Sequence, residues 1–342
     1  MNKIVKNSFL YLMVVFFMSV VLVPLMFLTT ISLSSNTELY DFPKNFLPNR
    51  KVDLVVDWDA EDSEYIVSRY ATDDRKQALY AGTDYESIAA YFERYLNIVV
   101  EPETLEEDFA PVRESEESLD ISYNKALFSN YVQFFSIFDG AFAALVNSLK
   151  AVAYTILLSL SIGGLVGYAL ARTTIKGKEP IGLASLVVRM FPIVSVSVPL
   201  AVLLIRYGMF DTILGIAIVY SIPNIGLTAW ITRSIFVGLD KELEEASFVF
   251  GATKLRTLRS ITAPLVIPGF AAASMYSFII AWNDTAVALL LTDRNETLAL
   301  LIFRSIGSTS AIHYASAGAI MLIIPALIFT FVLKDYIKRI WG

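Results

Sequence analysis

Residues 240–264 form a long polar interruption in an otherwise apolar C-terminal half, and they carry the side chains best suited to binding a partner. Three glutamates lie in the first half of this stretch and three basic residues in the second. Leu243, Ala246, Ser247 and Phe250 recur at i, i+3, i+4 and i+7. This spacing predicts a short helix with one small apolar face.

The second half of the stretch predicts another short helix. Gly251 provides a stop for the first helix, and Thr253 can cap the second. The second helix would turn three apolar side chains inward and three basic side chains outward. The inward residues are Leu255, Leu258 and Ile261, and the outward ones are Lys254, Arg256 and Arg259. Two short helices that meet at an elbow could dock into a socket on a soluble partner. The simpler alternative is an ordinary amphipathic loop between two membrane helices.

The elements that must position this elbow are membrane helices. Hydrophobic residues make up 56% of the 342 residues and the mean hydropathy is +0.59, above the usual share of globular proteins. Six apolar segments can cross a hydrocarbon core about 30 Å thick. They are residues 9–33, 151–171, 181–205, 212–232, 263–291 and 315–333. Lysine and arginine concentrate on the side that holds both termini and residues 240–264, so the positive-inside rule predicts that this side is cytoplasmic.

Composition excludes several kinds of chemistry. The chain has no cysteine, which excludes disulfides and thiolate metal sites. A single histidine leaves little room for histidine-based catalysis or metal binding. No Gly-x4-Gly-Lys-Ser/Thr run exists, so we expect that this chain does not hydrolyse ATP and is not an enzyme.

The spacing within residues 240–264 resembles the coupling loop of ABC-importer permeases. That signature is Glu-Ala-Ala, three residues, Gly, nine residues, and Ile-x-Leu-Pro. Here Glu245-Ala246-Ser247 precedes Gly251, and Ile261 and Pro264 follow with both spacings kept. Further runs resemble the smaller, maltose-type permease subunit of carbohydrate importers, at residues 147–149, 167–172, 191–192, 211–215 and 290–292.

The resemblance implies an all-α integral membrane protein with the six-helix bundle of a type I ABC importer permease and an acidic extracytoplasmic insertion after the first span. The expected parts are an anchor helix at residues 1–33, an extracytoplasmic region at 34–138 and a five-span core at 139–342, with a cytoplasmic coupling loop at 234–263. The residues expected to couple to an ATPase are Glu244, Glu245, Ala246, Ser247, Gly251, Ala252, Ile261 and Pro264.

The same resemblance implies ATP-driven import of a sugar or oligosaccharide, with this chain forming half of the translocation path. The implied partners are a second permease subunit in a hetero-dimer, an ATPase dimer that binds ATP and Mg²⁺, and an extracytoplasmic solute-binding protein. The implied location is the cytoplasmic (inner) membrane of a prokaryote, among its lipids. We expect no cofactor, metal or nucleic acid on this chain itself.

The insertion, at about residues 49–125, is strongly acidic. Residues 33–130 hold 22 acidic and 9 basic side chains, a net of −13, whereas the whole chain carries −6, so the remainder carries +7. This imbalance favours a region held away from the anionic cytoplasmic leaflet. An amphipathic helix is predicted at residues 85–96, before a Glu-rich tract at 101–117. A docking surface for the binding protein and a solvated ornament are both consistent with this composition.

Polar and helix-breaking residues inside the spans are candidates for the translocation path or its gate. They are Arg189, Pro192, Pro223, Asn224, Trp282, Asn283 and Asp284. An arginine within a span is costly, so Arg189 either extends back to the interface or faces the pathway. The run 282–284 could bind a sugar, but its predicted position near the outer face favours a gate or a structural contact.

Two alternatives remain open from the sequence, besides a membrane-anchored receptor whose acidic outer domain does the work. The first is an ABC importer for another solute, such as an amino acid, phosphate or a polyamine. The second is a secondary transporter, which usually has inverted repeats and a carboxylate at mid-membrane depth. We find no such repeat in this sequence.

Overall fold

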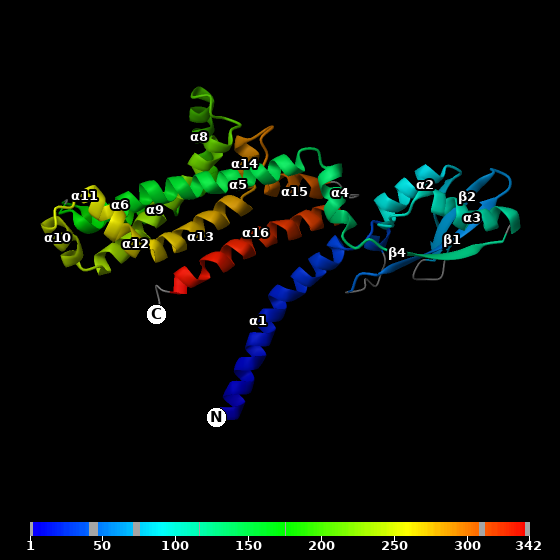
Figure 1. Ribbon diagram of the computed structural model, residues 1–342, viewed down its shortest axis with the longest axis horizontal. Helices are drawn as coiled ribbons and strands as arrows, with labels where there is room; N and C mark the ends of the chain where they lie inside the picture. The colour runs from blue at the N-terminus through cyan, green and yellow to red at the C-terminus, as the bar shows by residue number, and fades with distance from the viewer. Residues whose placement is uncertain are drawn as a thin grey trace. The chain divides into compact units, whose positions relative to one another are not determined.

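The computed structural model describes residues 3–40, 47–70, 76–115, 117–174, 176–307 and 312–338. The chain divides into two compact units, and most of their helices and strands are labelled in Figure 1. The first unit comprises Met1–Asp139 and Ser305–Ile320, and the second comprises Gly140–Arg304 and Met321–Gly342.

The first unit contains a four-stranded antiparallel sheet, so the predicted all-α fold class is wrong for the insertion. The strands lie in the order β3-β2-β1-β4. Their bounds are Lys51–Asp59 for β1, Glu64–Tyr70 for β2, Lys76–Gly82 for β3 and Leu119–Asn124 for β4. The signal for β1 is the alternation of Leu54, Val56 and Trp58. Three aspartates in the same strand, Asp53, Asp57 and Asp59, give the segment the composition of a solvated loop, which conceals the alternation.

Helices cover one face of this sheet (Figure 1). The helix predicted at residues 85–96 is confirmed as α2 (Tyr85–Tyr91) followed by the π-helical η2 (Phe92–Leu96). The acidic tract forms α3 (Pro102–Ser115). Leu105, Phe109 and Val112 of α3 are buried at helical spacing against Val56 and Val67 of the sheet.

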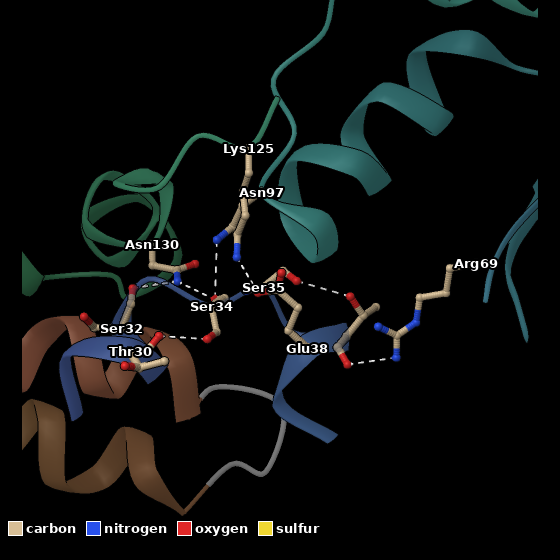
Figure 2. A network of polar contacts seen from close by, with 10 residues as sticks. Thr30, Ser32, Ser34, Ser35, Glu38, Arg69, Asn97, Lys125 and Asn130 are labelled. Atoms are coloured by element: carbon tan, nitrogen blue, oxygen red, sulfur yellow. Dashed lines mark hydrogen bonds and ion pairs between the residues drawn. The ribbon is translucent and has the colours of Figure 1, made fainter. Parts of the chain in front are cut away.

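A network of polar contacts joins α4 and the end of the insertion to the end of α1 (Lys3–Ser32) and the residues after it, as Figure 2 shows. Asn130, on α4 (Ser129–Ile137), donates its side-chain amide to the carbonyls of Ser32 and Ser34, both at 2.8 Å. Lys125, whose side chain is fully buried, pairs with Glu38 on η1 (Thr37–Tyr40). Burial lowers the pKa of Lys125, and the charge of Glu38 partly opposes this effect.

The second unit is helical. Its elements are α5 (Ala141–Leu158), the π-helical η3 (Ser159–Gly163), α6 (Gly164–Arg172), α7 (Lys178–Val188), α8 (Ile193–Arg206), α9 (Ile213–Gly238), α10 (Lys241–Val249), α11 (Lys254–Thr257), the π-helical η4 (Leu258–Thr262), α12 (Ala263–Leu265), α13 (Ile267–Asn283), α14 (Ala286–Leu291) and most of α15 (Leu298–Ile306). Helix α16 (Ile312–Lys338) begins in the first unit and ends in the second.

Within the described ranges, four helices are long and apolar enough to cross a membrane, or up to six if each bent pair is one span. The predicted third span is broken between α7 and α8, which meet at 92°. The predicted fifth span is broken between residues 265 and 267, where the two parts meet at 72°. All six predicted segments overlap a long helix or a bent pair, but the fifth extends past the end of α13 at Asn283 into α14.

Helix α9 packs at very short distances against its neighbours because glycines remove the intervening side chains. A Cβ atom on Gly167 of α6 would lie 2.0 Å from Oγ1 of Thr232 and 2.7 Å from the carbonyl oxygen of Ala229, both on α9. A Cβ atom on Gly226 would lie 2.1 Å from the carbonyl oxygen of Ser185 on α7. Small residues at helix contacts are the usual means of association in lipid, where burial of apolar surface gives little driving force.

A carboxylate joins two loops of the second unit. Oδ1 of Asp211, just before α9, accepts backbone N–H groups of Asp293, Arg294 and Asn295 at 2.9, 3.1 and 3.0 Å. Burial raises the pKa of Asp211, but these backbone donors outweigh burial and hold the pKa below its usual 3.8. Asp211 has a φ of 56°, a left-handed conformation that aspartate and asparagine tolerate.

We predict that Gly167→Ala destabilises the protein by roughly 1–3 kcal/mol, because the new methyl group overlaps with α9. Gly238→Ala is the matched control, since nothing lies within 4 Å of its added Cβ atom. The control should unfold at or slightly above the wild-type temperature, because alanine favours helices. Thermal unfolding in detergent measures both variants, and equal melting temperatures would refute the close contact.

We also predict a pH effect for Asp211→Asn. Because the folded pKa of Asp211 is lowered, its stabilising contribution is complete above the unfolded value of 3.8 and is lost as the pH falls below it. Thermal unfolding between about pH 6 and pH 3 should therefore show a smaller acid-induced decrease in the variant. Asp293→Asn, which removes an exposed neighbouring carboxylate, should keep the wild-type decrease. An unchanged acid profile in Asp211→Asn would count against the assigned role.

Candidate functional site

The polar stretch 240–264 forms the predicted elbow. Helix α10 has Glu242 and Glu244 in its first turn, where a negative charge interacts favourably with the helix dipole. It ends at Val249, and Gly251, two residues later, has a φ of +82°, which is unfavourable for residues with a Cβ atom. The backbone N–H of Gly251 donates to the carbonyl of Phe248 at 2.9 Å. Thr253 then caps α11 by accepting the backbone N–H of Arg256 at 3.3 Å.

The two helices of the elbow meet through hydroxyl groups and not through leucines. The hydroxyls of Ser247 and Thr257 lie 2.7 Å apart, and both residues are buried. Leu255, predicted to point inward, is 74% exposed, and Phe250 is 90% exposed. The prediction for Leu255 is therefore wrong. Helical spacing identifies an apolar stripe but not the surface that covers it, and nothing in the described part of this chain covers Phe250 or Leu255.

Two adjacent glutamates that looked equivalent in the sequence have different surroundings. Glu245 is exposed, whereas only 10% of the Glu244 side chain is exposed. Oε1 of Glu244 accepts Nε of Arg172 at 2.8 Å, and Oε2 accepts the hydroxyl of Tyr168 at 3.2 Å. Sequence reasoning did not assign Arg172 or Tyr168 to the site. One feature of the sequence could have indicated Arg172. It is a basic residue at the end of a span, and the elbow carries glutamates with which it can pair.

The other predicted coupling residues lie on the elbow or at its base. Ala246 is exposed, and Ala252 and Ile261 are partly buried. Pro264 is exposed in the first turn of α12, where its missing N–H is not needed. The structure therefore brings all eight of these residues into one segment, α10 to α12.

Arg189 and Pro192 lie at the 92° break between α7 and α8. The guanidinium carbon of Arg189 is 4.1 Å from the ring centroid of Tyr276 on α13, a cation–π contact. Pro192 immediately precedes α8, where a proline costs no helical hydrogen bond. The tyrosine ring gives the charge a partner within the protein.

Pro223 and Asn224 lie within α9, which continues through the proline. Asn224 is fully buried and donates its side-chain amide to the carbonyl of Tyr220 at 2.7 Å. Pro223 borders an apolar cavity of about 70 Å³ that is lined by residues of α8 and α9, with Val188 and Phe191. Asn224 is therefore covered by its neighbours, whereas Pro223 remains partly exposed beside the cavity.

The run 282–284 has three different environments. Trp282 is fully buried, stacks on Phe278 with ring centroids 5.5 Å apart, and donates its indole N–H to the carbonyl of Leu322 at 2.9 Å. Asp284 accepts the hydroxyl of Tyr220 at 3.0 Å and the backbone N–H of residue 287 at 2.8 Å. Asn283 is exposed. This geometry favours a structural use of the indole and the carboxylate over stacking of a sugar.

Tyr220 connects two predicted path residues that are 60 positions apart. Its carbonyl accepts from Asn224 and its hydroxyl donates to Asp284. Tyrosine is common in apolar spans, so its sequence position gave no reason to select it. Arg189 makes a different contact, with the ring of Tyr276 on α13.

Comparison with known proteins gives a match to the family described as binding-protein-dependent transport system inner membrane component, over residues 163–340. The trehalose transport system permease protein SugB of Mycobacterium tuberculosis (strain CDC 1551 / Oshkosh) is 31% identical over 197 residues, 56% of this chain and 72% of that protein. The trehalose/maltose transport system permease protein MalG of Thermococcus litoralis is 29% identical over 218 residues, 62% of this chain and 78% of that protein.

A solved structure is similar in fold. It is described as a bacterial ABC transporter involved in the import of the acidic polysaccharide alginate. The TM-score is 0.63 at 16% sequence identity, and the match covers 98% of each chain. At this identity the likeness shows the fold alone, which is that of a mostly helical membrane permease.

The family match includes the elbow and extends over just over half of the chain. The family consists of inner-membrane permease components, so this multi-pass chain is a permease and not an enzyme. The chain belongs to the binding-protein-dependent transport system inner membrane component family, the permeases of ABC transporters.

Proposed function

We propose that this chain is the transmembrane permease subunit of an ATP-driven importer for a sugar or oligosaccharide. It would form half of the translocation path with a second, different permease subunit. Two of its relatives, SugB and MalG, support a sugar, since their names describe trehalose and trehalose/maltose transport systems. Both termini and the elbow would lie in the cytoplasm, on the side that the positive-inside rule indicates.

The observation that carries this proposal is the exposed apolar surface of the elbow. Val249, Phe250 and Leu255 are 85%, 90% and 74% exposed, on a segment rich in charge. Exposed aromatic and aliphatic side chains between polar neighbours are typical of a binding surface. The occupant we assign is an ATPase subunit that binds ATP and Mg²⁺, because the chain has no phosphate-binding loop of its own.

The sheet-containing insertion would contact the solute-binding protein outside the membrane. Two sets of contacts support this placement of the insertion. The fully buried Lys125 pairs with Glu38, and Asn130 donates hydrogen bonds to the carbonyls of Ser32 and Ser34. The Lys125–Glu38 pair holds the end of the insertion to η1, which follows the first span. Deletion of residues 49–124 should weaken binding of the solute-binding protein and leave the ATPase contact intact.

We predict that Phe250→Asp abolishes stable association with the ATPase. Loss of a central aromatic anchor typically costs 2 kcal/mol or more, so the Kd should rise by at least about 30-fold. Titration of the purified permease pair with the ATPase subunit measures this change. Val99→Asp is the matched control, since Val99 is also exposed, at 66%, but lies in the insertion. Equal affinities for the wild type and Phe250→Asp would refute the proposed surface.

We predict that Gly251→Val lowers ATP-dependent uptake of maltose and trehalose into proteoliposomes while membrane insertion is retained. The φ of +82° at Gly251 disfavours a β-branched residue, so the angle between α10 and α11 would change. Gly208→Val is the control, because Gly208 has a φ of +67° with open space around it and lies between α8 and α9. It should cost similar stability and leave uptake per folded transporter unchanged. Equal uptake by both variants would contradict the role of the elbow.

A further inference from the structure

A cluster of three side chains connects the elbow to the end of the second span. Nε of Arg172 lies 2.8 Å from Oε1 of Glu244, and the hydroxyl of Tyr168 lies 3.2 Å from Oε2. Nη2 of Arg172 also donates to the carbonyl of Leu239 at 3.2 Å, just before α10 begins. The exposed fractions of the Arg172 and Glu244 side chains are 9% and 10%.

Glu244 is the side chain by which α10 is held to this span. Only Glu244 and Ser247 are buried among the residues of α10. Ser247 bonds to Thr257 and so connects the two helices of the elbow with each other. Arg172 and Tyr168 lie on α6, and the ring of Tyr168 packs edge-on against Phe236 of α9 at 5.3 Å.

This cluster resists displacement of α10 relative to α6. Separation of Glu244 from Arg172 would leave a buried charge without its partner, which is strongly unfavourable. Arg172 holds both Glu244 and the backbone at Leu239, so α10 cannot turn about its first residue without breaking one of these bonds. At the other end of α6, the π-helical η3 interrupts the regular helix of the span, and such interruptions often occur at functional sites.

We propose that Arg172, Tyr168 and Glu244 form the positioning link that makes α6 move with the elbow, so that the motion reaches the second span and is absorbed at η3. This inference rests on the proposed function, because the ATPase supplies the motion. Glu244 would then act by transmission within the chain, whereas Phe250 and its exposed neighbours would act by binding the ATPase. The two roles are separable by experiment.

The test is hydrogen–deuterium exchange of the complex isolated with its ATPase, with and without ATP, Mg²⁺ and vanadate. In the wild type, nucleotide should change exchange both in residues 241–250 and in residues 159–172. In Glu244→Gln, the change in residues 241–250 should persist, and the change in residues 159–172 should fall by at least about fivefold. A side chain that merely stabilised the fold would not separate these two responses.

Glu179→Gln is the matched control, because Glu179 also pairs with an arginine, Arg233, but is 65% exposed. It should respond to nucleotide as the wild type does. Tyr168→Phe is the milder variant if Glu244→Gln does not assemble. It keeps the ring against Phe236, removes one donor to Glu244, and should reduce the change in residues 159–172 by about twofold.

Two results would overturn the link: a wild-type nucleotide response of residues 159–172 in the assembled Glu244→Gln or Tyr168→Phe variant, or no response of residues 159–172 in the wild type. Failure of the wild-type chain to co-isolate with any ATPase would instead refute the proposed function. The same holds if Phe250→Asp binds the ATPase normally.

Discussion

The close approach of α9 to its neighbours is the constraint on which the second unit depends. Gly167 and Gly226 allow backbone contact with α9 from α6 and α7, where any side chain would overlap. Helices in lipid gain little from burial of apolar surface, so this contact and the dispersion forces that it permits must provide much of the association. Because α9 is fixed in this way, the broken spans on either side can bend without separating from the bundle.

Several polar groups within the spans have partners inside the protein. Tyr220 joins Asn224 to Asp284, and Trp282 bonds to the carbonyl of Leu322. Arg189 lies over the ring of Tyr276 at the break between α7 and α8. An unsatisfied polar group costs several kcal/mol in hydrocarbon, so such pairs both stabilise the bundle and limit the positions where it can open.

The buried and the exposed groups of the elbow differ in chemistry. The groups that hold it to the protein are polar and buried, namely Ser247 with Thr257 and Glu244 with Arg172. The groups left exposed, such as Phe250 and Leu255, are apolar. This arrangement leaves the apolar side chains exposed and makes the position of the elbow depend on directional hydrogen bonds.

Local sequence by itself determined the six apolar segments, the side of the membrane on which the elbow is predicted, and the elbow with its stop at Gly251 and its cap at Thr253. These features depend on the composition and spacing of neighbouring residues, which a sequence displays directly. Only the tertiary structure decided that the acidic insertion contains a sheet, that Glu244 is buried beside an exposed Glu245, and that Leu255 points outward. Strand pairing, ion pairs and burial depend on residues far apart in the chain, and local spacing carries no record of which segment will meet which.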